Sequence, residues 1–165
     1  RIANGSALEE AVLKDAMRDC DLIISVIGEK TFWKPFTTLS DSAALQLKIM
    51  TELGIRRWIG IGHGLILEHE EGGLIGDHGI PTILENLFTE KKREYELIKN
   101  SALEWTLLCP KYMPNGELTK NYYLVEDRLP ENADSISVED VADAMVNIAL
   151  KHSFVKKRVG IGYNA

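Results

Sequence analysis

Three short apolar runs, each followed by a turn-forming residue, indicate buried strands. They lie at residues 22–27, 57–61 and 105–109, with shorter candidates at 122–125 and 159–161. The first run stops at Gly28, and the third is broken by Pro110. None of the three alternates between apolar and polar positions, which is the pattern of parallel strands covered on both faces. We therefore expect these three strands to be adjacent, parallel and buried.

Between the strands, apolar residues recur at helical spacing behind candidate capping residues. The expected helices run from a Ser6–Glu9 capping box to about Arg18, from Ser40 or Asp41 to Gly54, from a Thr82–Glu85 capping box to about Asn100, and from Ser137 through Ala149. Alternating strands and helices predict an α/β protein with a parallel sheet and helices on both faces. No repeat or linker interrupts the pattern, so residues 1–165 are expected to form a single domain.

The carboxyl ends of parallel strands are where α/β proteins bind ligands. This rule selects three segments of the chain, namely Gly28–Glu29, Gly62–Gly64 and Cys109–Tyr112. His63 is a candidate proton donor at such an end, because the ordinary pKa of histidine lies near neutral pH. A turn histidine bonded to the backbone is the alternative for this residue.

Lys91 interrupts an apolar helix face. Leu84, Phe88, Lys91, Tyr95 and Ile98 step by four and three residues, so they share one face, and its central position holds a lysine. A buried ammonium is costly unless it is paired or faces a polar cavity. Either Lys91 serves a ligand, or it lies at the edge of the face and extends its ammonium into solvent.

Composition removes several classes of function. The chain has 165 residues and a formal net charge of −6, which disfavours binding to a nucleic-acid backbone. No apolar run approaches the roughly 20 residues of a membrane helix, and the first residues do not resemble a signal peptide. Two cysteines, Cys20 and Cys109, cannot form a disulfide framework, so we expect a reducing cytoplasm.

Other motifs favour structural roles. Residues 60–64 are glycine-rich but lack the third glycine of a dinucleotide loop, since Leu65 stands there, and no Walker motif is present. The loop at 62–81 contains acids and His63, His69 and His78, whose spacings match no recurrent metal site. Cys109 is interpreted as a small buried hydrophobe. The basic run at 91–93, interleaved with glutamates, is interpreted as a solvated helix face.

Four segments together resemble the atypical short-chain dehydrogenase/reductases. They are residues 5–28, 53–59, 101–110 and 135–142, and residues 118–122 resemble the subgroup of biliverdin-IXβ (flavin) reductases and NmrA-like proteins. The resemblance implies a Rossmann fold that holds NAD(P)H, with NADP favoured on this ground alone, and hydride transfer at the carboxyl edge of the sheet.

The departures from the family are also informative. The family's first strand, glycine-rich phosphate loop and second strand would precede Gly5, so that N-terminal βαβ portion is expected to be absent from this chain. The family's Tyr-x-x-x-Lys pair falls on Leu87 and Lys91, so only the lysine is kept. Its strand-end serine or threonine pair corresponds to Gly62 and His63, and the acid beside the adenine is replaced by Ser6.

Three functions are compatible with these residues. The leading hypothesis is an NAD(P)H-dependent oxidoreductase that acts on a small planar organic acceptor. The alternatives are a non-catalytic dinucleotide-binding sensor or scaffold, and a cofactor-independent isomerase or cyclase. The leading hypothesis assigns catalysis to His63 and Lys91, cofactor binding to Ser6, Gly28, Gly62, Lys91 and Pro110, and the border of the substrate to Tyr112. The expected partner is a small molecule, without nucleic acid, membrane or metal, and the oligomeric state stays open.

Overall fold

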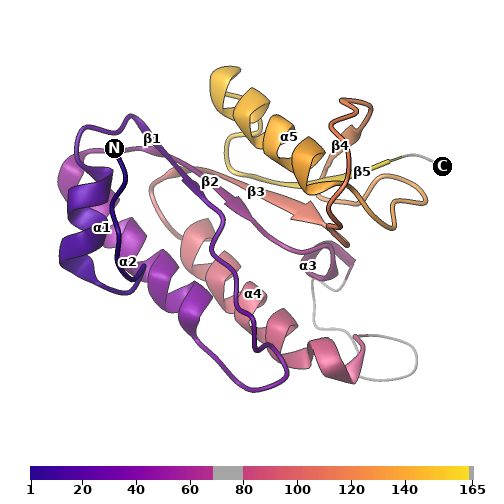
Figure 1. Cartoon of the computed structure of the whole chain (residues 1–165), viewed down its shortest axis with the longest axis horizontal. Coiled ribbons are helices and arrows are strands. Elements are labelled where there is room, and N and C mark those ends of the chain that lie inside the picture. Colours follow the sequence, from indigo (N-terminus) through magenta and orange to yellow (C-terminus); the bar gives the residue numbers. More distant parts are fainter. Residues whose placement is uncertain (69–79, 164–165) are drawn as a thin grey trace.

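The computed structural model describes residues 1–68 and 80–163, which contain one five-stranded sheet. Its strands are β1 (Leu22–Ser25), β2 (Arg57–Ile61), β3 (Glu104–Pro110), β4 (Tyr123–Glu126) and β5 (Lys157–Gly162). The spatial order is β1-β2-β3-β5-β4, and only the β4–β5 pair is antiparallel. The predicted adjacency and parallel pairing of the first three strands are confirmed, as is the α/β class (Figure 1).

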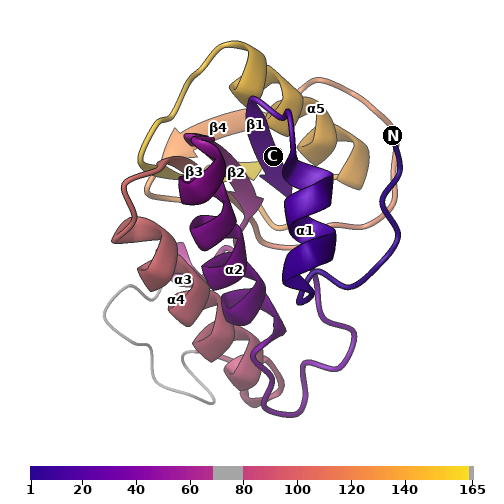
Figure 2. The same cartoon turned by 90° about the vertical axis from the view of Figure 1, so that its left-hand side faces the viewer.

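Helices cover both faces of the sheet, as expected. The helices are α1 (Glu10–Met17), α2 (Thr38–Leu53), α3 (Leu65–Glu68), a 3₁₀ turn η1 (Thr82–Leu84), α4 (Glu85–Lys99) and α5 (Val138–Leu150). Figure 1 shows α2 and α4 beneath the sheet and α5 above it, and Figure 2 shows α2 between α1 and α4. The short α3 stands where the sequence indicated only loop.

Burial on both faces is confirmed for β2 and β3 but is wrong for β1. Every residue of β3 from Trp105 to Pro110 is buried, whereas Ile24 of β1 is 39% exposed and Val26 behind it is 67% exposed. Among the described residues β1 pairs only with β2. Its outer edge and the side facing α5 are therefore less covered than the apolar run suggested.

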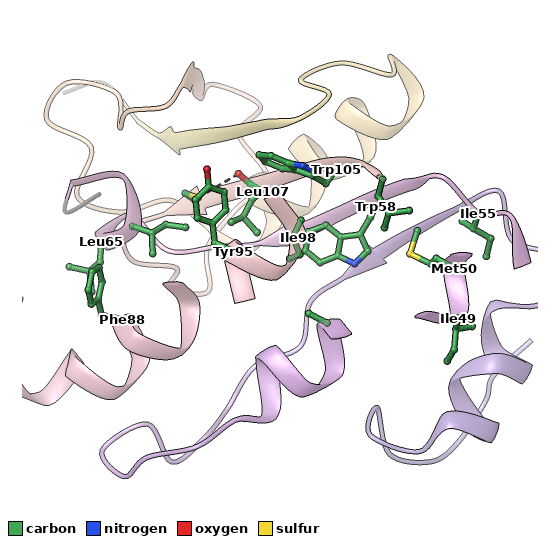
Figure 3. Packing of buried hydrophobic residues seen from close by; sticks show 14 of the residues in the cluster. Ile49, Met50, Ile55, Trp58, Leu65, Phe88, Tyr95, Ile98, Trp105 and Leu107 are labelled. Carbon is green, nitrogen blue, oxygen red and sulfur yellow. Dashed lines mark hydrogen bonds between the residues drawn. The ribbon is translucent and has the colours of Figure 1, made fainter. Parts of the chain in front are cut away.

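The core beneath the sheet is built on aromatic residues. Trp58, Tyr95, Ile98, Trp105 and Leu107 meet between the strands and α4, and the rings of Tyr95 and Trp105 are 5.9 Å apart, edge to face (Figure 3). The buried indole N–H of Trp58 donates to the side-chain oxygen of Gln46 on α2 at 2.9 Å. This bond satisfies a polar group that would be costly to leave unpaired.

The core above the sheet joins α5 to β2, β3 and β5. Ser137 caps α5 as predicted, since its hydroxyl accepts the N–H of Asp140 at 3.1 Å.

The carboxylate of Asp140 is fully buried. It accepts hydrogen bonds from the backbone and hydroxyl of Thr119, the backbone of Lys120 and the hydroxyl of Tyr163. Burial alone raises the pKa of Asp140, but the hydrogen bonds outweigh it and lower the pKa to about 2.

Two of the predicted helix caps are wrong. The Ser6 hydroxyl accepts the N–H of Leu8 in a local turn, and α1 begins only at Glu10. Thr82 lies within η1 and does not cap a helix. The N-cap positions are Pro81 for η1 and Leu84 for α4, and neither position has a side-chain capping hydrogen bond. The predicted end of α2 is confirmed: Gly54 is left-handed (φ 73°) and donates to the last turn, a conformation that glycine adopts without strain.

Candidate functional site

A cavity of about 600 Å³ opens at the carboxyl ends of β1 and β2. Two of the three strand ends selected from the sequence, Gly28–Glu29 and Gly62–Gly64, contribute to it, together with residues of α4 and α5, whereas no residue of Cys109–Tyr112 does. Its lining is mainly apolar and comprises Val26, Ile27, Gly28, Glu29, Phe32, Leu39, Ile61, Gly62, His63, Leu87, Lys91, Met113, Val138, Val141, Ala142 and Met145. A concave apolar surface with few polar groups is typical of a small-molecule site.

Lys91 is buried on the face of α4 that its spacing predicted. Its side chain is 7% exposed, and its Nζ donates to the backbone oxygen of Ile61 at 2.6 Å and to Glu94 Oε2 at 2.9 Å. The alternative that Lys91 extends into solvent is therefore wrong. An ammonium has three N–H donors, so these two bonds leave one for a ligand in the cavity.

His63 lies beside Lys91 in the turn after β2. Its Nδ1 accepts the backbone N–H of Leu65 at 3.1 Å, so the neutral ring carries its proton on Nε2. Burial, reinforced by the positive charge of Lys91, lowers the pKa of His63 to about 4. The expectation that His63 titrates near neutral pH is therefore wrong. The hydrogen bond from the backbone that the alternative interpretation predicted for a histidine in a turn is present.

The two glycines at the strand ends differ in their surroundings. A Cβ on Gly28 would meet no atom within 4 Å, so a ligand has room to approach its backbone. A Cβ on Gly62 would lie 2.6 Å from Cys109 Sγ. The N–H groups of Gly62 and Gly64 donate to the oxygens of Leu108 and Pro110. Both amides are therefore hydrogen-bonded to β3 and cannot bind a phosphate. This agrees with the interpretation of the segment as a strand end rather than a phosphate loop.

The remaining predicted site residues do not line the cavity. Ser6 lies in the exposed turn before α1, and Pro110 is buried at the end of β3. Tyr112 is 65% exposed, and it is Met113, not singled out in the sequence, that reaches the cavity. The structure therefore brings together Gly28, Gly62, His63 and Lys91 and leaves the other three candidates outside.

Cys109 is fully buried, and burial raises the pKa of its thiol to about 12, so the interpretation as a buried hydrophobe holds. Within residues 1–68 and 80–163 no group of three or more His, Cys, Asp or Glu side chains could hold a metal ion. His69 and His78 lie outside the described residues. None of the helices in those two ranges is both long and apolar enough to cross a membrane.

A family model described as NAD(P)H-binding matches residues 1–152. The chain belongs to this NAD(P)H-binding family. None of the curated proteins matches the sequence. The residues at the cavity fit the nicotinamide and ribose end of such a cofactor: the apolar lining suits a planar ring, the open backbone at Gly28 leaves space, and Lys91 offers an N–H donor. No G-x-G-x-x-G sequence is present among the 165 residues to hold its phosphates.

Solved structures share this fold. A short-chain dehydrogenase/reductase from Veillonella parvula DSM 2008, in complex with NADP, has a TM-score of 0.73 at 18% identity and aligns over 98% of this chain and 71% of its own. A Rossmann-fold NAD(P)-binding family protein from Shigella flexneri has a TM-score of 0.71 at 22% identity and aligns over 98% of this chain and 69% of its own. A protein from Streptococcus pneumoniae TIGR4, proposed to be an NADH-flavin reductase, has a TM-score of 0.64 at 23% identity and aligns over 92% of this chain and 75% of its own. At these identities the likeness establishes the Rossmann-like fold alone.

Two buried glutamates of α4 were missed in the sequence. Glu90 and Glu94 are 1% and 5% exposed when the whole residue is counted, so the interpretation of this interleaved run as a solvated face is wrong for both. Glu90 accepts the N–H of Ser40 at the start of α2 and pairs with Arg93. The signal that could have revealed Glu94 is its i,i+3 spacing from a lysine expected to be buried.

Proposed function

We propose that the protein is an NAD(P)H-dependent oxidoreductase that reduces a small planar organic acceptor in the cavity between β1, β2, α4 and α5. The observation that carries this proposal is the buried Lys91 ammonium, held at the carboxyl end of β2 in a chain of the NAD(P)H-binding family. The strand end is where the cofactor's reactive end belongs in such sheets.

Lys91 is assigned to the nicotinamide ribose. Its remaining N–H donates to a ribose hydroxyl, while the bonds to Ile61 and Glu94 fix the ammonium and limit its movement. Gly28 and Gly62 both line the cavity, and the open space beside Gly28 lets the ring approach its backbone without meeting a side chain. A reduced nicotinamide held by these residues would supply a hydride to the acceptor.

His63 is assigned to the acceptor. Because its pKa is about 4, the ring is neutral at physiological pH and acts as a hydrogen-bond donor through Nε2–H, not as a strong acid. A donor of this kind stabilises negative charge that develops on a carbonyl or ring nitrogen during reduction. Phe32 and Met113 provide apolar contacts for a planar molecule.

The experiment that tests this function follows the loss of reduced nicotinamide absorbance with NADPH and NADH, in the presence of free FMN or of benzoquinone. We expect turnover by the 165-residue chain and, for His63→Leu, which removes the donor, a decrease of roughly 100-fold in kcat, the range for losing one such donor. His152→Leu is the matched control, because His152 is exposed and lies beside Glu104 at the opposite end of the sheet. NADPH binding without oxidation of any acceptor would contradict the proposal and favour a non-catalytic sensor.

A further inference from the structure

Glu94 is a buried carboxylate to which no role in binding has yet been given. It lies on α4 three residues after Lys91, and the two side chains are each only 7% exposed. Its Oε2 lies 2.9 Å from Lys91 Nζ. Placing a carboxylate here is costly, since burial raises the pKa of Glu94, and the charge of Lys91 opposes that rise.

The geometry constrains the lysine from two sides. Lys91 donates one N–H to the backbone oxygen of Ile61, the last residue of β2. It donates a second N–H to the carboxylate of Glu94, which lies on α4 like the lysine. The lysine side chain is long and has many rotamers, so a single bond would leave its ammonium free to swing about the strand end. Two bonds from different elements fix the direction of the third N–H, and Lys91 lines the cavity.

We propose that Glu94 is a positioning residue, which holds the Lys91 ammonium against Ile61 so that its third N–H is directed at the nicotinamide ribose. This inference rests on the proposed function. Glu94 itself is absent from the cavity lining, so its effect on binding passes through Lys91. A carboxylate suits this position better than a neutral acceptor, because its charge adds Coulombic attraction to the hydrogen bond from the ammonium and so holds it more firmly.

Glu94→Gln is the sharpest variant, because it keeps the shape and one acceptor oxygen but removes the charge. The matched control is Glu90→Gln. Glu90 lies one position before Lys91 and is also buried, but its oxygens bind Ser40 of α2 and Arg93 of α4. Each variant removes the charge of one buried carboxylate of α4, but only the Glu94 carboxylate is hydrogen-bonded to Lys91.

The measurement is the calorimetric dissociation constant for NADPH in wild type, Glu94→Gln, Glu90→Gln, Lys91→Met and the Lys91→Met/Glu94→Gln double variant, at a temperature where thermal denaturation shows each to be folded. We expect Glu94→Gln to weaken NADPH binding about tenfold, because the ammonium of Lys91 loses the ion pair that fixes its direction. Glu90→Gln should bind like wild type. In the Lys91→Met background, Glu94→Gln should cause no further loss.

The outcomes separate the two proposals. If Lys91→Met binds NADPH as tightly as wild type, the assignment of Lys91 to the ribose is wrong, and with it the proposed function of this site. If Lys91→Met weakens binding but Glu94→Gln does not, the positioning role alone is overturned. A further loss from Glu94→Gln in the Lys91→Met background would show that Glu94 acts through general packing, which also overturns it.

Discussion

Lys91 Nζ donates to the backbone oxygen of Ile61 at 2.6 Å and thereby ties the middle of α4 to the carboxyl end of β2. The bond places a positive charge in the lining of the cavity, near His63 and Cys109, and that charge acts to lower the pKa of both. The same ammonium is neutralised by Glu94. Structure and proposed chemistry therefore depend on one side chain.

Replacing the lysine separates these two roles. Lys91→Met keeps the length of the side chain but leaves Glu94 buried without its cation, so we expect the free energy of unfolding to fall by about 3 kcal/mol, as for other broken buried pairs. Denaturant titration measures this change. Lys91→Met/Glu94→Gln removes both charges and should recover part of the loss. A single Lys91→Met variant as stable as wild type would show that the pair contributes no stability.

His63 gives a pH dependence with a defined direction. Its pKa in the folded protein is about 4, below the ordinary value of 6.5, so folding favours the neutral ring. Its contribution to stability is complete above pH 6.5 and decreases as the pH falls towards 4. An NMR titration of the imidazole should give a midpoint near 4, and His63→Gln should reduce the acid sensitivity. A midpoint near 6.5 would show that the ring is solvated.

The two glycines of the cavity offer a matched pair. Gly62→Ala places a Cβ against Cys109 Sγ and Leu107, and we expect it to cost about 1–3 kcal/mol through overpacking. Gly28→Ala meets no neighbouring atom and should leave stability unchanged, while it narrows the cavity and weakens NADPH binding. Thermal denaturation and calorimetry distinguish the two effects. Cys109→Ala should partly rescue Gly62→Ala, and the absence of any rescue would argue against this contact.

Asp140 holds the segment before β4 to the start of α5. Asp140→Ala would leave the amides of Thr119 and Lys120 and the hydroxyl of Tyr163 without their acceptor, and we expect a loss of about 3 kcal/mol. Asp134→Ala, at an 89% exposed side chain, is the control. Because the pKa of Asp140 is lowered to about 2, its contribution is present above pH 3.8 and is lost as the pH falls through 2.

Much of the scaffold follows from local pattern. Residues 57–61 form β2 with the predicted bounds, because a short run dominated by bulky apolar residues, between turn residues, suits a buried strand. The apolar face of α4 and the cap at Ser137 were also predictable, since both depend on spacing within one element. Ser6 was not, because a serine three residues before a glutamate can equally form the local turn that it forms here.

The site was only partly predictable, because most of it depends on contacts between distant segments. The rule for strand ends brought Gly28, Gly62 and His63 together correctly, since β1 and β2 are adjacent and parallel. It could not give the pKa of His63, which depends on burial and on Lys91 from another element. Nor could it select Met113 over Tyr112, because loop side chains are oriented by packing that carries no periodic pattern.

The most direct test of the site is a crystal structure of the chain grown with NADPH. We expect the nicotinamide to lie in the cavity against the backbone of Gly28 and Gly62, with a ribose hydroxyl about 3 Å from Lys91 Nζ, a normal hydrogen-bond distance. Nucleotide bound elsewhere, with the cavity empty and the Lys91 ammonium contacting only Ile61 and Glu94, would contradict the assignment of this cavity to the cofactor.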